Sequence, residues 1–301
     1  MTRPRWVVVA VLGSLLLGGC AAQDAPEGRA VSAAPAVSAV VPAGRTDETV
    51  AAAEPTAAAG RRTARPLRGT RIVLDPGHQL GNRNFPEKIN RQVPAGGFTK
   101  ACNTTGTSTD GGYAEATFVW QVTRQVRRRL EKLGARVQLT RSTNSARRWG
   151  PCVDERGRAG NSSGADLKLS IHGDGSYADG AHGFHVIAPT DRRPWTHDIY
   201  RSSRLLATKV RAALHRRAGL DHATYVAGGD GLDFRADLGT LNLSDIPTVM
   251  VELGNMRDAG DARMMTSKRG RATYAKALVQ GARAFLRAHP TPQGEPLRFD
   301  G

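Results

Sequence analysis

The sequence predicts an α/β domain built on a mainly parallel, mixed sheet that is flanked by helices. Two observations carry this prediction. Short apolar runs alternate along the chain with longer segments whose apolar residues recur at helical spacing, as in strand–helix–strand units. Three of the apolar runs end at His78, His172 and Glu252. Because the carboxyl ends of parallel strands gather at one edge of a sheet, where open α/β folds bind ligands, we expect these residues to share a site.

The first half of the domain begins with a strand at residues 71–74, which a Pro-Gly pair stops. Residues 79–112 are polar and rich in Gly, Asn and Thr, which predicts a long loop over the site. A helix from about residue 114 to 133 follows, since its apolar residues fall on one face of a 3.6-residue period. A strand at residues 135–140 and a short helix at residues 153–161 complete this half.

The second half repeats the alternation. Residues 167–172 and 183–188 are apolar runs of strand length, and residues 195–217 place four aliphatic side chains on one helical face. The last strand covers residues 248–252, and a closing helix is indicated by the apolar spacing around residues 274–285. Five strands and four helices in this order favour one domain with a mainly parallel sheet.

The first 66 residues are predicted to precede this domain. Residues 1–19 combine two arginines with an apolar run too short to span a bilayer comfortably, which is typical of a secretory signal peptide. The run ends in Leu-Gly-Gly before Cys20, which resembles the lipobox of bacterial lipoproteins, where the cysteine becomes the lipidated first residue. Ordinary cleavage just after this cysteine, which would discard it, is the alternative.

The amino-acid composition divides the rest of the chain into a tether, a folded domain and a tail. Residues 20–66 are rich in Ala, Pro, Val and Gly and contain no aromatic residue, which predicts a disordered tether on the order of 40 Å in coil dimension. Residues 67–289 are predicted to be the folded catalytic domain, and residues 290–301 a loose tail. The tether would let an anchored domain sample a layer of cell wall.

The predicted export from the cytoplasm affects how the two remaining cysteines and the net charge are interpreted. Cys102 and Cys152 both lie in loop-like sequence, and outside the cytoplasm such a pair is more often bridged than free; two unrelated thiols are the alternative. The formal net charge is +16. For an exported chain, this charge predicts contact with anionic wall polymers and lipid head groups, and no role in nucleic-acid binding. We expect a monomer.

The residues at the predicted strand ends have the chemistry of a metal centre. Two imidazoles and one carboxylate can hold zinc and activate a water molecule, and His78, His172 and Glu252 supply that set. Glu115, which opens the predicted helix after a Gly-Gly turn, is a fourth candidate. A carboxylate in that position is also favoured by the helix macrodipole alone. The spacing is too long for a local motif, so position at strand ends carries the prediction.

Four blocks of sequence resemble the zinc-dependent N-acetylmuramoyl-L-alanine amidases, which are peptidoglycan amidases with a mixed α/β sheet. The resemblance covers about residues 71–288. In family order, the blocks are Ile72–His78, the helix opened by Glu115 with the following Gly134–Arg141, Ala165–His172, and Ile246–Asn255.

The resemblance implies one zinc ion per chain, with His78, Glu115 and His172 as its ligands and Glu252 as the acid–base carboxylate. In this scheme Glu252 takes a proton from water and passes it to the leaving amine of L-alanine. The implied reaction is hydrolysis of the amide between N-acetylmuramic acid and L-alanine in peptidoglycan, during cell-wall remodelling. The implied location is the outer face of the cytoplasmic membrane and the cell wall, through a lipid anchor.

The chain departs from the family pattern in three places. The Gly-Gly pair that usually follows the first histidine is replaced by residues 79–82, the asparagine two residues beyond the second histidine is Asp174, and the insertion at residues 79–112 is long. None of these changes removes a ligand, so they bear on cleft shape and substrate preference. Arg235 is a candidate for binding a substrate carboxylate in a bidentate manner, with a structural ion pair as the equal alternative.

Two other functions are compatible with the residues alone. An exported zinc carboxypeptidase would act on the same stem peptides but would release terminal amino acids. A non-catalytic wall-binding lipoprotein on an amidase-like scaffold would have no need of an acid–base residue, and the presence of Glu252 argues against it.

Overall fold

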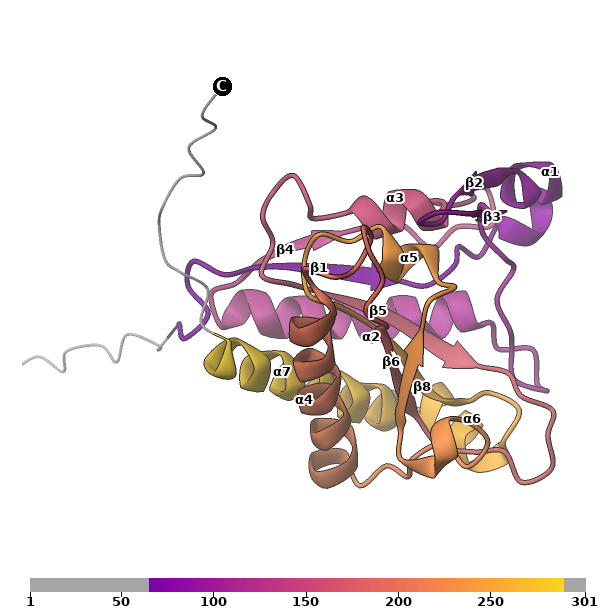
Figure 1. Cartoon of the computed structure of the whole chain (residues 1–301). Coiled ribbons are helices and arrows are strands. Elements are labelled where there is room, and N and C mark those ends of the chain that lie inside the picture. The colour runs from indigo at the N-terminus through magenta and orange to yellow at the C-terminus, as the bar shows by residue number, and fades with distance from the viewer. Residues whose placement is uncertain (1–64, 290–301) are drawn as a thin grey trace, which may run out of the picture. The chain divides into compact units, whose positions relative to one another are not determined.

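A six-stranded sheet in the order β4-β1-β5-β8-β6-β7 runs through the computed structural model, which describes residues 65–289 (Figure 1). The strands are β1 (Arg71–Pro76), β4 (Arg136–Leu139), β5 (Leu167–Asp174), β6 (His185–Pro189), β7 (Leu232–Arg235) and β8 (Thr248–Asn255). Strands β4, β1, β5 and β8 are parallel, whereas β6 runs antiparallel to β8 and β7 runs parallel to β6. The predicted mainly parallel, mixed sheet is confirmed.

Helices cover both faces of this sheet (Figure 1). One layer contains α2 (Glu115–Lys132), α4 (Tyr200–Ala218) and α7 (Lys268–Ala288), and the other contains α3 (Val153–Arg158) and α5 (Gly239–Asn242). The main hydrophobic core lies between the sheet and the first layer, and Leu169, Ile171 and Val251 of the central strands are fully buried in it. Because side chains alternate along a strand, His172 and Glu252 point toward the second layer, that of α3 and α5.

The segment at residues 79–112 is more ordered than predicted. It contains a 3₁₀ turn η1 (Asn82–Asn84), the short helix α1 (Pro86–Asn90) and a small hairpin of β2 (Gln92–Pro94) and β3 (Thr99–Ala101). A disulfide joins Cys102, directly after the hairpin, to Cys152 at the start of α3, with 4.3 Å between the two Cα atoms. The predicted pairing of these cysteines is therefore present, and it ties the hairpin segment to the helix layer beside the site.

Several short elements were missed by the apolar patterns. Strand β7 has only four residues at the edge of the sheet, and the 3₁₀ turn η2 (Ala227–Gly229) precedes it. Helix α6 (Ala259–Thr266) is set by its N-cap, where the side chain of Asp258 accepts a hydrogen bond from the backbone of Asp261 at 2.8 Å. Such elements are too short to show a hydrophobic period.

The predicted signal peptide, Cys20, tether and C-terminal tail lie outside the described residues, so they stay predictions. Within residues 65–289, no helix has both the length and the apolar character that a bilayer span requires.

Candidate metal centre

His78 lies in a strained turn directly after strand β1. Its backbone has a φ of +53°, a left-handed conformation that is uncommon for residues other than glycine and that recurs at functional sites. Gly77 makes this turn possible, because a Cβ at that position would lie 2.4 Å from the ring of His172. The chain can therefore bring the two imidazoles together only with a glycine at this position, and their ring centroids are 5.0 Å apart.

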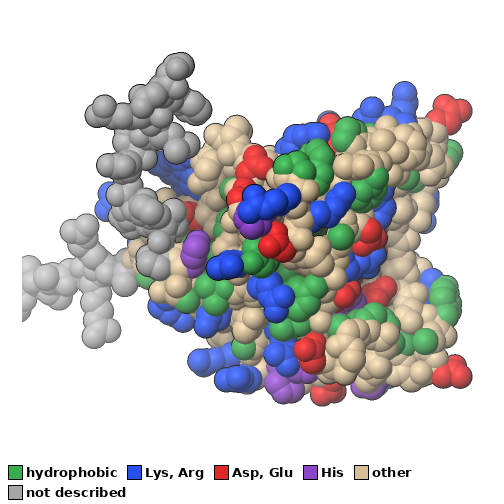
Figure 2. All heavy atoms as spheres, viewed as in Figure 1, with side chains coloured by type: hydrophobic (Ala, Val, Ile, Leu, Met, Phe, Trp, Pro, Cys, Tyr) green, Lys and Arg blue, Asp and Glu red, His purple; other side chains and the backbone are tan. Residues whose placement is uncertain are grey.

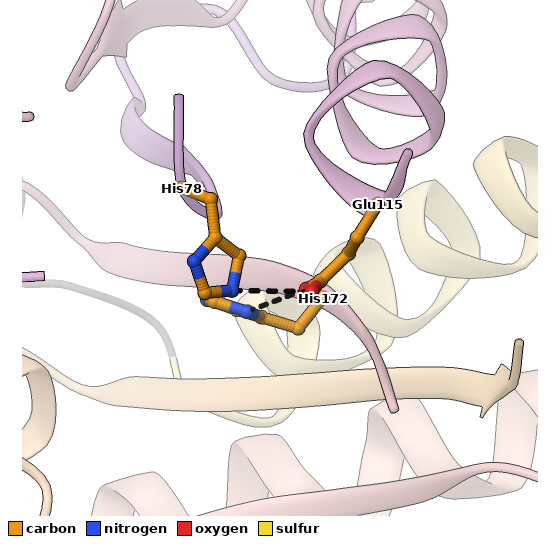
Figure 3. A group of neighbouring side chains, drawn as sticks. All are labelled: His78, Glu115 and His172. Atoms are coloured by element: carbon orange, nitrogen blue, oxygen red, sulfur yellow. Dashed lines mark hydrogen bonds and ion pairs between the residues drawn. The ribbon is translucent and has the colours of Figure 1, made fainter. Parts of the chain in front are cut away.

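Glu115 joins the two histidines (Figure 3). It is the first residue of α2, and its Oε2 lies 3.2 Å from Nε2 of His78 while its Oε1 lies 3.0 Å from Nδ1 of His172. Backbone amides of Thr107 and Gly173 donate to the two carboxylate oxygens at 3.0 and 3.2 Å. The carboxylate is thus held in place between the rings by groups from two other segments.

Protonation in this cluster follows from its burial and its charges. Burial alone would raise the pKa of Glu115, but the neighbouring imidazoles outweigh it and hold the pKa below its usual range. Burial alone would lower the pKa of His78, but the Glu115 carboxylate raises it above the ordinary value. Each partner therefore favours the charged form of the other, as expected for three donors that converge on one point.

The donor set fits zinc. Imidazole nitrogens and a carboxylate oxygen are the ligands of catalytic zinc sites, and each imidazole here presents one nitrogen to a different oxygen of the Glu115 carboxylate, at 3.2 and 3.0 Å. One donor atom from each of His78, Glu115 and His172 lies within 4.8 Å of the others. The second ring nitrogen of His78, Nδ1, lies 3.1 Å from the carbonyl oxygen of Thr104. Donation to that carbonyl leaves Nε2 unprotonated and free to bind a metal.

Glu252 lies beside this cluster on strand β8. It is in register with His172 of β5 on one side and with His185 of β6 on the other. Its Oε2 is buried and has no hydrogen-bond partner among the described residues. Burial and the carboxylates of Glu115 and Asp174 raise the pKa of Glu252 well above its usual range. A partly buried carboxyl whose pKa is raised, and one of whose oxygens has no partner among the described residues, is suited to exchange a proton near neutral pH.

Two buried arginines, neither of which was singled out from the sequence, hold the backbone of the His78 turn. Arg156 of α3 donates to the carbonyl oxygens of Pro76 and His78, both at 2.8 Å. Arg141 donates to the carbonyl oxygens of Pro76 at 3.0 Å and Gly77 at 3.1 Å, and also to that of Ala116 in α2 at 3.0 Å. Arg141 therefore links the turn that carries His78 to the helix start that carries Glu115.

The carboxylate of Asp75 forms an ion pair with Arg156, one of these two arginines. One of its oxygens accepts from Arg156 and from Thr140, and the other accepts from Ser170 at 2.7 Å. Burial alone would raise the pKa of Asp75, but the Arg156 guanidinium and the two hydroxyls together lower it to about 2. Asp75 therefore acts on His78 through Arg156 and the backbone, not by direct contact with the imidazole.

Arg235 is not part of the cluster. It ends strand β7, two strands from β8 in the sheet, and forms two hydrogen bonds of 2.8 and 2.7 Å with the carboxylate of Asp237. These bonds raise the pKa of Arg235 and lower that of Asp237 to about 2. The ion-pair alternative is thus present, and a role in binding substrate stays a prediction.

Asp174, one of the departures from the family pattern, lies at the end of β5. It accepts a hydrogen bond from the hydroxyl of Tyr225 at 3.0 Å, and burial followed by this carboxylate raises the pKa of Tyr225. His185, next to Glu252 in the sheet, is buried, and its Nδ1 has no partner among the described residues. These residues form one wall beside Glu252.

The fold and this cluster define a class: an α/β protein with a candidate metal centre of two histidines at strand ends and a glutamate at a helix start, beside a partly buried acid. The family described as N-acetylmuramoyl-L-alanine amidase matches residues 72–284. The N-acetylmuramoyl-L-alanine amidase Rv3717 of Mycobacterium tuberculosis is 40% identical over 240 residues, which cover 79% of this chain and 95% of that protein.

Two solved structures are similar as well. The N-acetylmuramyl-L-alanine amidase Ami1 of Mycobacterium abscessus, in its apo form, is 44% identical with a TM-score of 0.67, and the match covers 73% of this chain and all of that one. The enzyme of the same name from Mycobacterium smegmatis is 39% identical with a TM-score of 0.68, over 74% of this chain and 99% of that one. The chain belongs to the N-acetylmuramoyl-L-alanine amidase family and is an enzyme.

Proposed function

We propose that this enzyme is a zinc hydrolase that cleaves the amide between N-acetylmuramic acid and L-alanine in peptidoglycan during cell-wall remodelling. His78, Glu115 and His172 would hold the zinc, and Glu252 would act as the acid–base residue. The observation that carries the proposal is the convergence of these three residues, with one donor atom of each within 4.8 Å of the others, next to a strand that carries a partly buried carboxyl whose Oε2 has no partner among the described residues.

The chemistry of an amide explains why both parts are needed. An amide is a weak electrophile with a poor leaving group. Bound zinc would supply a Lewis acid that polarises the carbonyl and makes a water molecule more acidic. Glu252 accepts the proton that water loses and delivers it to the departing nitrogen of L-alanine. The raised pKa of Glu252 favours the second transfer, because a carboxyl that holds a proton more tightly is also available as an acid near neutral pH.

The rest of the chain prepares the site. Arg141 and Arg156 fix the backbone on which His78 is carried, so little ordering remains when the metal binds. The disulfide keeps the 79–112 segment, whose Thr104 orients His78, attached to α3. We further propose that the protein is exported, lipidated at Cys20 and held as a monomer at the membrane surface, which the leader-like composition of residues 1–19 supports.

A soluble muramyl peptide tests the reaction. Wild-type protein with zinc should release the intact stem peptide with a free L-alanine amino group, which mass spectrometry of the products identifies. Glu252→Gln keeps the shape of the side chain and removes its proton exchange, so turnover should fall ~10²–10⁴-fold while zinc stays bound.

Glu131→Gln is the matched control, because Glu131 lies on the surface of α2 and its one ion pair among residues 65–289 is with Arg127 at 2.7 Å; its turnover should equal that of the wild type. Undiminished turnover in Glu252→Gln would contradict the assigned role. Release of single terminal amino acids by the wild type would instead identify a carboxypeptidase.

A further inference from the structure

The positive charge of this chain is concentrated in two helices. Helices α4 and α7 together contain twelve Lys and Arg residues and no Asp or Glu, so they supply twelve of the sixteen net positive charges. The two helices pack against each other on the same face of the sheet. In Figure 2, Lys and Arg side chains are concentrated on the lower left of the drawn face, over α4. The remaining sequence is almost balanced in charge.

Where the two helices cross, they form a basic groove. Gly281 of α7 lies so close to Val210 of α4 that a Cβ on the glycine would be 2.8 Å from the valine Cα. Beside this crossing is a groove of about 350 Å³, which we call the α4–α7 groove and which alanines and one glutamine line together with five cations. The cations that line the α4–α7 groove are Lys209, Arg216, Arg217, Arg283 and Arg287. Within residues 65–289, none of these five forms an ion pair with a carboxylate.

Helix stability does not account for this arrangement. Arg216, Arg217 and Arg287 lie in the last turns of their helices, where cations interact favourably with the macrodipole. Lys209 and Arg283 lie outside the last turns and have no such partner. Like charges that share one groove repel one another, and a bound anion would offset that repulsion.

The groove is separate from the candidate metal centre. The metal cluster lies at the ends of β1 and β5 and at the first residue of α2, whereas the groove is lined by the C-terminal halves of α4 and α7 and shares no residue with the cluster. The position therefore fits a surface that orients the whole domain better than a subsite for the segment of substrate being cleaved.

We propose that the α4–α7 groove and the neighbouring cations of both helices bind the anionic phosphate head groups of a phospholipid bilayer. The charge is spread along two helices rather than focused on a single pocket, as suits a planar anionic surface. The sequence also predicts lipidation at Cys20 and a tether with a coil dimension on the order of 40 Å, which would keep the domain within reach of lipid head groups.

Vesicle binding tests this inference directly. The solved M. abscessus relative is matched over its whole length by 73% of this chain, so residues 65–289 are used alone, without the predicted anchor. The probes are vesicles of phosphatidylcholine with and without phosphatidylglycerol. Cosedimentation should require phosphatidylglycerol and should weaken steeply with salt, because exposed charges are screened within about 10 Å at 0.1 M ionic strength.

Variants in which cations are replaced by glutamine test whether the α4–α7 groove is the membrane-binding surface. The groove variant carries Arg216→Gln, Arg217→Gln, Arg283→Gln and Arg287→Gln, and its affinity for the anionic vesicles should fall roughly 10²- to 10³-fold, at about fivefold per cation. The matched control removes four exposed cations from outside the two helices. Its substitutions are Arg83→Gln, Lys88→Gln, Arg147→Gln and Arg148→Gln. It should lose less than tenfold.

Membrane binding by this groove does not depend on zinc or on Glu252. The membrane proposal and the proposed zinc hydrolase activity can therefore fail independently of each other. The groove variant should keep its zinc and its turnover on a soluble muramyl peptide, which also shows that it is folded. Equal vesicle affinity of the groove variant and the wild type would overturn the proposal. Tighter binding of the wild type to a poly(glycerol phosphate) wall polymer than to vesicles of equal phosphate content would overturn it as well.

Discussion

Replacement of Asp75 by asparagine is expected to destabilise the domain in a pH-dependent way. The carboxylate is fully buried and forms an ion pair with the equally buried Arg156. Asparagine is nearly the same size and keeps one oxygen as an acceptor, but it carries no charge. The substitution therefore leaves the Arg156 guanidinium buried without a carboxylate and creates no cavity.

The expected loss of stability can be worked out from the pKa of Asp75. The pKa of Asp75 falls from 3.8 to about 2 in the folded state, which corresponds to about 2.5 kcal/mol of stabilisation at neutral pH. Loss of one partner from a buried ion pair typically costs about 3–5 kcal/mol. We expect the free energy of unfolding at pH 7 to fall by roughly 3 kcal/mol, or about 6–12 °C in Tm for a domain of this size.

The stabilisation by Asp75 changes with pH in one direction. Because the pKa is lower in the folded than in the unfolded state, the stabilisation is fully present above about pH 4 and is lost as the pH falls toward 2. Urea titrations of wild-type and Asp75→Asn protein between pH 3 and 7 should therefore show curves that converge on acidification. Glu131→Gln breaks only an exposed pair and should change stability by about 0.5 kcal/mol or less. A difference below 1 kcal/mol at pH 7, or one that stays constant down to pH 3, would refute this reasoning.

Three further outcomes are expected. Metal analysis of purified protein should find near-stoichiometric zinc in the wild type and little in His78→Ala or His172→Ala; full retention in both variants would remove the ligand assignment. Cys20→Ala should move the protein from the membrane fraction to the medium, whereas a wild type that is already soluble would rule out the lipid anchor. Cys102→Ser with Cys152→Ser opens a bridge between residues 50 apart in sequence and should lower stability by about 4 kcal/mol in the chain-entropy model, measured by thermal unfolding; an unchanged Tm would contradict it.

The parts of the fold that the sequence predicted are those with a repeating apolar pattern. Helix α2 was expected at about residues 114–133 and covers Glu115–Lys132, because a long amphipathic period is set by the core it faces. Strand β7 and the β2–β3 hairpin were missed, because four and three residues are too few for a period. The antiparallel direction of β6 was not predictable either, since direction depends on the path of the connection and not on the strand itself.

The candidate site divides in the same way. His78, Glu115, His172 and Glu252 were proposed because each follows or begins an element and because they match a family pattern, and the structure brings the first three together. Arg141 and Arg156 were not found, since an isolated arginine in the sequence carries no sign that it will be buried. Only the three-dimensional arrangement shows that their guanidinium groups bind the backbone between residues 76 and 78.

The two arginines also matter for any attempt to copy this centre into another protein. The proposed ligands occupy three short stretches of chain, yet the shape of the His78 turn is maintained by guanidinium groups from residues 141 and 156. A graft that carried only these three stretches would reproduce the donor atoms and lose the side chains that hold the His78 backbone in place. A minimal transplant must therefore include Arg141, Arg156 and the carboxylate of Asp75.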